Sequence, residues 1–103
     1  MKRRSADIED GSNATAELAE VMVRLRTVAQ MQAFLEDLCT PAELEAMTDR
    51  WKVVPLLLEG VAYREIHDRT LVSVTTIGRV ARTLDRGAGG YAAAIERRAV
   101  RAG

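Results

Sequence analysis

The sequence predicts a small all-helical protein built as one domain, and three observations support this fold class. Apolar side chains recur at steps of three or four residues along most of the chain, whereas the strict alternation typical of a β-strand is absent. Proline and glycine residues stand where helices are expected to begin and end. The chain has 103 residues, of which 48% are hydrophobic, so it can build one packed core and is too short for two.

Residues 1–13 are expected to form a disordered N-terminal arm, followed by a helical domain over residues 14–103. The arm is polar and ends in Gly11, Ser12 and Asn13. It therefore offers too little apolar surface to fold by itself.

Residues 14–38 contain neither glycine nor proline and predict one long helix, or two helices with a slight break. Their apolar stripe consists of Leu18, Val21, Leu25, Val28, Met31, Leu35 and Leu38. An unbroken helix of 25 residues would be about 37 Å long, whereas a compact chain of this length has a radius of gyration of about 13 Å. We therefore expect residues 14–60 to supply the dimerisation helices of a homodimer. The alternative is a helix wrapped on the core of its own chain.

A second helix is expected from Pro41 to Glu59. Thr40, Pro41 and Glu43 resemble a capped helix start, and Gly60 suits a left-handed stop. The expected inward stripe is Leu44, Met47, Trp51, Val54 and Leu58. Pro55 lies within this helix and removes one backbone hydrogen bond.

Residues 62–85 predict a helix-turn-helix. A helix over residues 63–70 and a helix over residues 74–84, capped by Ser73, flank a turn of three residues. The positions that should face inward are all apolar, namely Ile66, Val72, Ile77 and Val80. After glycines at 87, 89 and 90, a last helix is expected within residues 88–101.

The charge distribution favours double-stranded DNA as a partner, although the net charge of the whole chain is zero. Residues 1–60 carry seven basic and eleven acidic side chains, a net charge of −4, whereas residues 61–103 carry eight and four, a net charge of +4. All eight basic residues of the second half are arginine, whose planar fork fits phosphates and guanine edges. For any single arginine, a solvated helix face is the alternative interpretation.

The outward face of the predicted helix over residues 74–84 has hydroxyls and arginines. It has no acidic residue before Asp85, so it can enter a major groove of DNA. The candidate DNA-binding residues are Arg64, His67, Arg69, Ser73, Val74, Thr75, Thr76, Gly78, Arg79 and Arg82. Among them, Val74 and Thr75 are candidates for base contact, and the arginines for phosphate contact. His67 has a structural role as its alternative.

Several classes of protein are disfavoured by the composition. The single cysteine, Cys39, excludes an internal disulfide and indicates a reducing, cytoplasmic setting. One histidine leaves little scope for zinc binding or histidine-based catalysis, and no catalytic motif is present. No apolar run is long enough to cross a membrane. We therefore expect neither an enzyme nor a cofactor or metal site.

From about Phe34 to Arg97, some 60% of the chain, the sequence resembles the Trp-repressor superfamily, and within it the Trp-repressor-like proteins of the YerC/YecD type. The matching stretches are residues 34–40, 50–60, 63–66, 76–80, 84–87 and 89–91. The resemblance implies an all-α, Trp-repressor-like helical bundle that forms an intertwined homodimer and binds operator DNA through its helix-turn-helix.

Three positions depart from the family pattern. Leu71 stands where a glycine is usual in the turn, so either the turn is rearranged or stability is lost. Gly78 replaces a polar residue in mid-helix, and Ala62 replaces a capping serine or threonine. These changes suggest a less rigid helix-turn-helix or an altered specificity for DNA sequence.

The resemblance also raises the question of tryptophan as a ligand. Thr40, Arg50, Thr76, Arg79 and Thr83 fall on or near the family's ligand-binding positions. Val80, however, stands where a glycine leaves room for the indole, so its side chain should fill the pocket and L-tryptophan is disfavoured. Arg50 and Arg79 would then serve in ion pairs or phosphate contacts.

The sequence therefore predicts a homodimeric, sequence-specific transcriptional regulator, either a repressor or an activator, that acts through its helix-turn-helix and independently of tryptophan. Two alternatives stay open. One is a dimeric helical protein-interaction module without DNA binding, which Leu71 and Gly78 would favour. The other is a tryptophan-responsive repressor.

Overall fold

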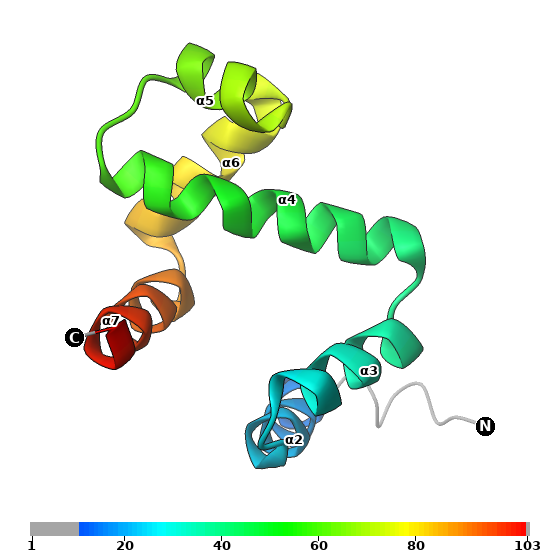
Figure 1. Ribbon diagram of the computed structural model, residues 1–103. Helices are drawn as coiled ribbons and strands as arrows, with labels where there is room; N and C mark the ends of the chain where they lie inside the picture. The colour runs from blue at the N-terminus through cyan, green and yellow to red at the C-terminus, as the bar shows by residue number, and fades with distance from the viewer. Residues whose placement is uncertain (1–10, 103) are drawn as a thin grey trace. The chain divides into compact units, whose positions relative to one another are not determined.

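The computed structural model describes the backbone of residues 11–102 and the side chains of residues 13–98. Within this range the chain is all-helical, as predicted, and contains no strand (Figure 1). In chain order the helices are α2 (Gly11–Arg24), α3 (Val28–Leu38), α4 (Pro41–Leu58), α5 (Tyr63–Thr70), α6 (Val74–Arg86) and α7 (Gly90–Ala102). The predicted arm falls outside the described residues up to position 10, and Gly11 to Asn13, expected within it, already belong to α2.

The chain divides into two compact units, residues 1–40 and residues 41–103. The division falls at the start of α4.

The first unit contains two helices separated at residues 25–27, so a single unbroken helix over residues 14–38 is wrong and the two-helix alternative is correct. Thr27 causes the break, because its hydroxyl accepts a hydrogen bond from the Gln30 amide at 3.0 Å and caps α3. The Gln30 side chain in turn accepts from the Arg26 amide at 3.0 Å. This pair resembles a capping box, in which two side chains satisfy amides at a helix start.

The break shortens the helices to 14 and 11 residues, about 21 Å and about 17 Å. An overlong helix therefore no longer supports the expected dimer. A different feature does: none of the side chains described in the first unit is buried. Its exposed large apolar residues are Leu18, Val21, Val23, Val28 and Leu38.

In the second unit, α4 ends in a hydrogen-bonded Schellman motif. The Gly60 amide donates to the Leu57 carbonyl at 3.0 Å, and the Val61 amide donates to the Leu56 carbonyl at 3.1 Å. Gly60 has a φ of 83°, a left-handed conformation that favours glycine. The predicted stop at Gly60 is confirmed, and α4 continues through Pro55 to reach it.

The core of the second unit is entirely apolar. Its buried side chains are Val53, Val54, Ile66, Val72, Ile77 and Val80. They come from α4, the α5–α6 turn and the two helices on either side of it, which pack against one another. Tyr91 and Ile95 of α7 pack against this core, as does Trp51, which confirms the predicted core role of the tryptophan.

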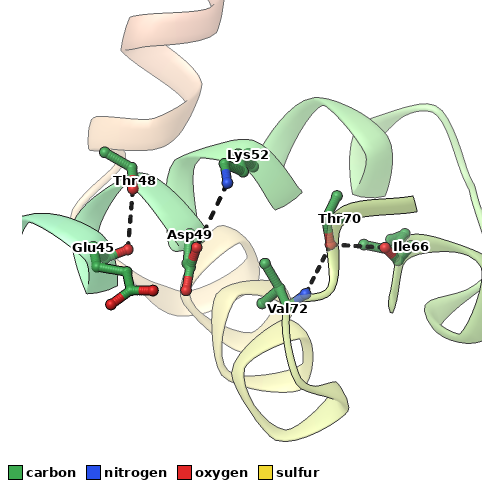
Figure 2. A network of polar contacts seen from close by, with 7 residues as sticks. All are labelled: Glu45, Thr48, Asp49, Lys52, Ile66, Thr70 and Val72. Carbon is green, nitrogen blue, oxygen red and sulfur yellow. Dashed lines mark hydrogen bonds and ion pairs between the residues drawn. The ribbon is translucent and has the colours of Figure 1, made fainter. Parts of the chain in front are cut away.

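The predicted inward stripe of α4 needs correction. Met47 is 39% exposed and Leu58 is 55% exposed, whereas Val53, which the stripe omitted, is fully buried. The core contacts of α4 lie within residues 51–57, because only this part of the helix meets the core of the unit. Toward its N-terminus α4 carries polar contacts instead, such as the hydrogen bond that the Thr48 hydroxyl donates to the Glu45 carbonyl at 3.1 Å (Figure 2).

Candidate nucleic-acid interface

Residues 63–86 form a helix-turn-helix whose inward positions are those predicted. Ile66 and Ile77 are fully buried, Val80 is 1% exposed and Val72 is 3% exposed. These side chains fix how α5 and α6 lie against each other and against α4. The start of α5 at Tyr63 and the start of α6 at Val74 match the sequence prediction, whereas α6 runs two residues further, to Arg86.

The turn between the helices keeps a left-handed conformation although it has no glycine. Leu71 has φ 66° and ψ 9°, and its amide donates to the His67 carbonyl at 2.7 Å. It is the only residue other than glycine with a positive φ in the described part of the chain. Of the two outcomes expected for Leu71, a rearranged turn is therefore wrong.

Two polar side chains of α5 stabilise the turn through hydrogen bonds. The Thr70 hydroxyl donates to the Ile66 carbonyl at 2.7 Å and accepts from the Val72 amide at 3.1 Å (Figure 2). The half-buried His67 ring lies 2.8 Å from the Val72 carbonyl through Nδ1. Because a carbonyl only accepts, Nδ1 carries the hydrogen in this bond. These bonds hold Val72 in the core on the far side of Leu71.

Ser73 caps α6, as predicted. Its Oγ accepts from the Thr76 amide at 3.1 Å and also donates to the Thr76 hydroxyl at 3.1 Å. Ala62 precedes α5 and makes no side-chain cap, again as its residue type predicts.

Most of the predicted DNA-binding residues lie on exposed positions of this helix-turn-helix. The exposed ones are Arg64, Arg69, Ser73, Val74, Thr75, Arg79 and Arg82. Thr76 and His67 are half-buried because they are engaged in the cap and the turn. Gly78 is half-buried too, and a Cβ built on it would lie 3.9 Å from Cε2 of Tyr63, so this position faces the start of α5 and not only the solvent.

The outward face of α6 carries cations that are available for phosphates. Within the described residues, neither Arg79 nor Arg82 has a carboxylate within ion-pair distance. Arg79, Arg82, Thr83, Arg86 and Gly87 line an open hollow of about 380 Å³. Arg69, by contrast, is paired with Glu65 on α5 at 3.5 Å, and Arg86 lies 3.6 Å from Asp85.

The residues at the family's ligand positions are distributed over both units. Thr40 belongs to the first unit, and Arg50, Arg79 and Thr83 to the second. Arg50 is half-buried and forms no ion pair with another described residue, so the ion-pair role expected for it and for Arg79 is not seen. The Thr83 hydroxyl donates to the Arg79 carbonyl at 3.1 Å.

Sequence reasoning missed a second hollow, between α5 and the start of α6. It is lined by Tyr63, Arg64, His67, Asp68 and Val74 and measures about 600 Å³. Tyr63 and Asp68 were not among the candidate residues. The available signal was the spacing of four positions between Tyr63 and His67 and between Arg64 and Asp68, since residues three or four apart on a helix share a side.

The described residues show neither a candidate metal centre nor a candidate membrane span. Among the described residues, no group of three or more His, Cys, Asp or Glu side chains is placed to hold a metal ion. No helix within the same range has the length and apolarity needed to cross a membrane.

Comparisons with known proteins agree with this geometry. A model of the Trp repressor protein family matches residues 13–99. The uncharacterized protein YerC of Bacillus subtilis (strain 168) is 33% identical over 81 residues, which are 79% of this chain and 78% of that protein. The crystal structure of a TrpR-like protein from Eubacterium eligens ATCC 27750 superposes with a TM-score of 0.78 and 31% identity, covering 86% of this chain and 92% of that one. With its fold, its helix-turn-helix and its sequence all matching, the chain belongs to the Trp repressor protein family.

Proposed function

We propose that this protein is a homodimeric, sequence-specific DNA-binding transcriptional regulator that acts in the cytoplasm through α5 and α6. One observation carries the proposal: the inward side of α6 is locked into an apolar core while its outward side presents Arg79 and Arg82 without a carboxylate partner among the described residues. No acidic residue occurs from Ser73 to Leu84, so this side can approach phosphates without repulsion.

In this proposal α6 enters the major groove, and the N-terminal residues Val74 and Thr75 contact base edges. Arg64, Arg79 and Arg82 contact phosphates, and Arg69 does so after leaving Glu65. Two copies of α6 lie about 34 Å apart on one side of the duplex. The family to which the chain belongs is one of repressors and not of enzymes.

The homodimer is supported by the first unit. Val23 is 79% exposed and Val28 is 82% exposed, and none of the described side chains of the unit is buried in the single chain. Two helices without a buried residue cannot offset the entropy of ordering them. A second copy of the chain would supply the missing cover.

The proposed regulator works without tryptophan. Val80 is 1% exposed and packs among the core residues, at the position where the family leaves room for an indole. Making that room would open a cavity in the core, which is costly. Isothermal calorimetry with L-tryptophan should give no heat of binding and no change in DNA affinity, and micromolar binding would contradict this part of the proposal.

The decisive experiment is the selection of bound fragments from random DNA with the full chain. We expect enrichment of a palindromic site whose half-sites are centred about 10 base pairs, or a multiple of that, apart. Enrichment of single, unpaired half-sites would contradict the dimeric docking.

A protein-interaction module is the second candidate, because Leu71 projects from the turn with 82% of its surface exposed. Such a module would retain the fold and bind an acidic protein through its arginines. A gel shift at low salt separates the two candidates: absence of any shift on genomic or random DNA favours the interaction module.

A further inference from the structure

The hollow between α5 and α6 has a mixed lining that differs from the arginine-lined hollow further along α6. Tyr63 and Val74 form its apolar part, and Arg64, His67 and Asp68 its polar part. Its volume of about 600 Å³ is open to solvent, so a group on another molecule can enter it. The hollow lies at the first turn of the proposed recognition helix.

Both apolar walls are exposed to water without belonging to the core. Tyr63 is 42% exposed and Val74 is 52% exposed, and neither is among the side chains packed on the apolar core. Gly78 of α6 places no side chain beside the tyrosine ring, since only a built Cβ would lie 3.9 Å from its Cε2. An apolar pair open to solvent gains free energy when an apolar group covers it.

The charges of the lining indicate which part of DNA fits. Asp68 is exposed and has no cation within ion-pair distance in the described part of the chain, so its carboxylate would offset the attraction of Arg64 for a phosphate placed in the hollow. The hollow formed by Arg79, Arg82 and Arg86 has no carboxylate in its lining and suits a phosphate better. A base edge is therefore the better occupant of the hollow at Tyr63.

Among the four bases, thymine alone presents an apolar group, its 5-methyl, in the major groove. The N-terminal residues of a recognition helix reach base edges while the preceding helix crosses the backbone, and this hollow lies between those two elements. We propose that Tyr63 and Val74 form a reading pocket for the thymine 5-methyl group, with Tyr63 as a specificity-determining residue. This inference rests on the proposed DNA-binding function.

The experiment uses the full chain and the DNA selected by it from random sequence. Each thymine of the selected site is replaced in turn by uracil, which removes only the methyl group, and the Kd is measured by fluorescence anisotropy. One thymine per half-site should show about a fourfold loss of affinity when its methyl is removed. In Tyr63→Ala and in Val74→Ala, this ratio of uracil to thymine Kd should fall toward one.

The matched control is Leu58→Ala, which shortens another exposed apolar side chain of the same unit, 55% exposed and outside the hollow. It should leave the uracil-to-thymine ratio of the wild-type chain unchanged. Far-UV circular dichroism and thermal melting establish that each variant is folded, and either hollow variant alone suffices for the test.

The outcomes separate this inference from the function on which it rests. If no DNA is enriched, both the proposed function and the proposed thymine-methyl pocket are wrong. If DNA is enriched but no thymine is sensitive, or the sensitivity persists in both hollow variants, the reading pocket is wrong and the DNA-binding function stands.

Discussion

Leu71 is the residue at which the helix-turn-helix holds backbone strain. A left-handed conformation costs a residue with a Cβ about 1–2 kcal/mol. The Leu71 side chain is 82% exposed, so it recovers little of this cost by burial. The surrounding bonds of Thr70 and His67 hold the turn in this left-handed conformation although it has no glycine.

Leu71→Gly is therefore expected to stabilise the protein. Relief of the left-handed strain exceeds the extra entropy that glycine gives the unfolded chain, for a net gain of about 0.5–1 kcal/mol. Urea unfolding at a fixed protein concentration measures the change. Leu71→Ala removes the same side chain but retains the strain, so it should change the free energy of unfolding little. A gain of the same size in both variants would show that the strain is not the cause.

Gly78 and Gly60 should respond in opposite directions to the same substitution. Gly78→Ala adds a Cβ at an ordinary contact distance of 3.9 Å from Tyr63, and alanine is better than glycine within a helix by about 1 kcal/mol. Gly60→Ala instead places a Cβ at a φ of 83° and should destabilise by about 1 kcal/mol. Thermal unfolding of the two variants and the wild type gives the comparison. A destabilised Gly78→Ala would mean that the position is more crowded than the contact distance indicates.

At the scale of single elements, one side of α6 packs in the core and the opposite side is available for DNA recognition. Ile77 and Val80 are buried on one side, whereas Thr75, Arg79 and Arg82 are exposed on the other. Ser73 and Thr76 bond to each other at the start of the helix and form its cap. Substitutions on the exposed side should therefore alter DNA affinity without unfolding the helix.

Arg82→Ala provides the test of this division. We expect weaker binding to all DNA sequences, and a salt dependence of the logarithm of affinity that is shallower by about one unit, because one phosphate contact is lost. Lys52→Ala is the control, since Lys52 is an exposed cation of α4 engaged with Asp49 and outside the helix-turn-helix. Unchanged affinity and slope in Arg82→Ala would place the phosphates elsewhere.

The helix-turn-helix could be predicted closely because its signals are local. The spacing of the apolar residues Ile66, Val72, Ile77 and Val80 predicted both helices, and the Ser73 cap predicted where α6 begins. What the sequence could not provide was the bonding of His67, since a ring of this kind suits a phosphate or a carbonyl equally well. The hollow at Tyr63 was missed because it depends on how two helices pack.

The first unit was harder to predict because its two signals conflict. An apolar stripe runs through residues 14–38 without interruption and favours one helix, whereas the Thr27–Gln30 pair favours a new start at Val28. The capping hydrogen bonds decide the outcome. The prediction of the inward side of α4 was wrong at Met47 and Leu58, because periodicity alone does not say how much of a helix is covered by neighbouring elements.

At the scale of the whole molecule, the exposed apolar side chains of the first unit determine the expected assembly. Val28→Asp puts a charge on this surface at the first position of α3, where a carboxylate is favourable for the helix itself. We expect analytical ultracentrifugation at micromolar concentration to show dimers of the wild type and monomers of the variant, because burying an unpaired charge is costly.

Thr75→Asp is the matched control for this prediction. It adds the same charge at an exposed position of α6 and should remain a dimer while losing DNA affinity. If Val28→Asp also stays dimeric, the dimer contact lies outside the first turn of α3.

The placement of the core has a consequence for how the chain folds. Among the side chains that the structure describes, the six buried ones lie between Val53 and Val80, so that no pair of them is more than 27 positions apart. Helical domains with such local contacts fold quickly, on a microsecond to millisecond scale, because little loop-closure entropy is lost before the contacts form. Residues 41–103 are thus expected to fold on each newly made chain before two chains meet. Dimerisation would then join two chains whose helix-turn-helix is already formed.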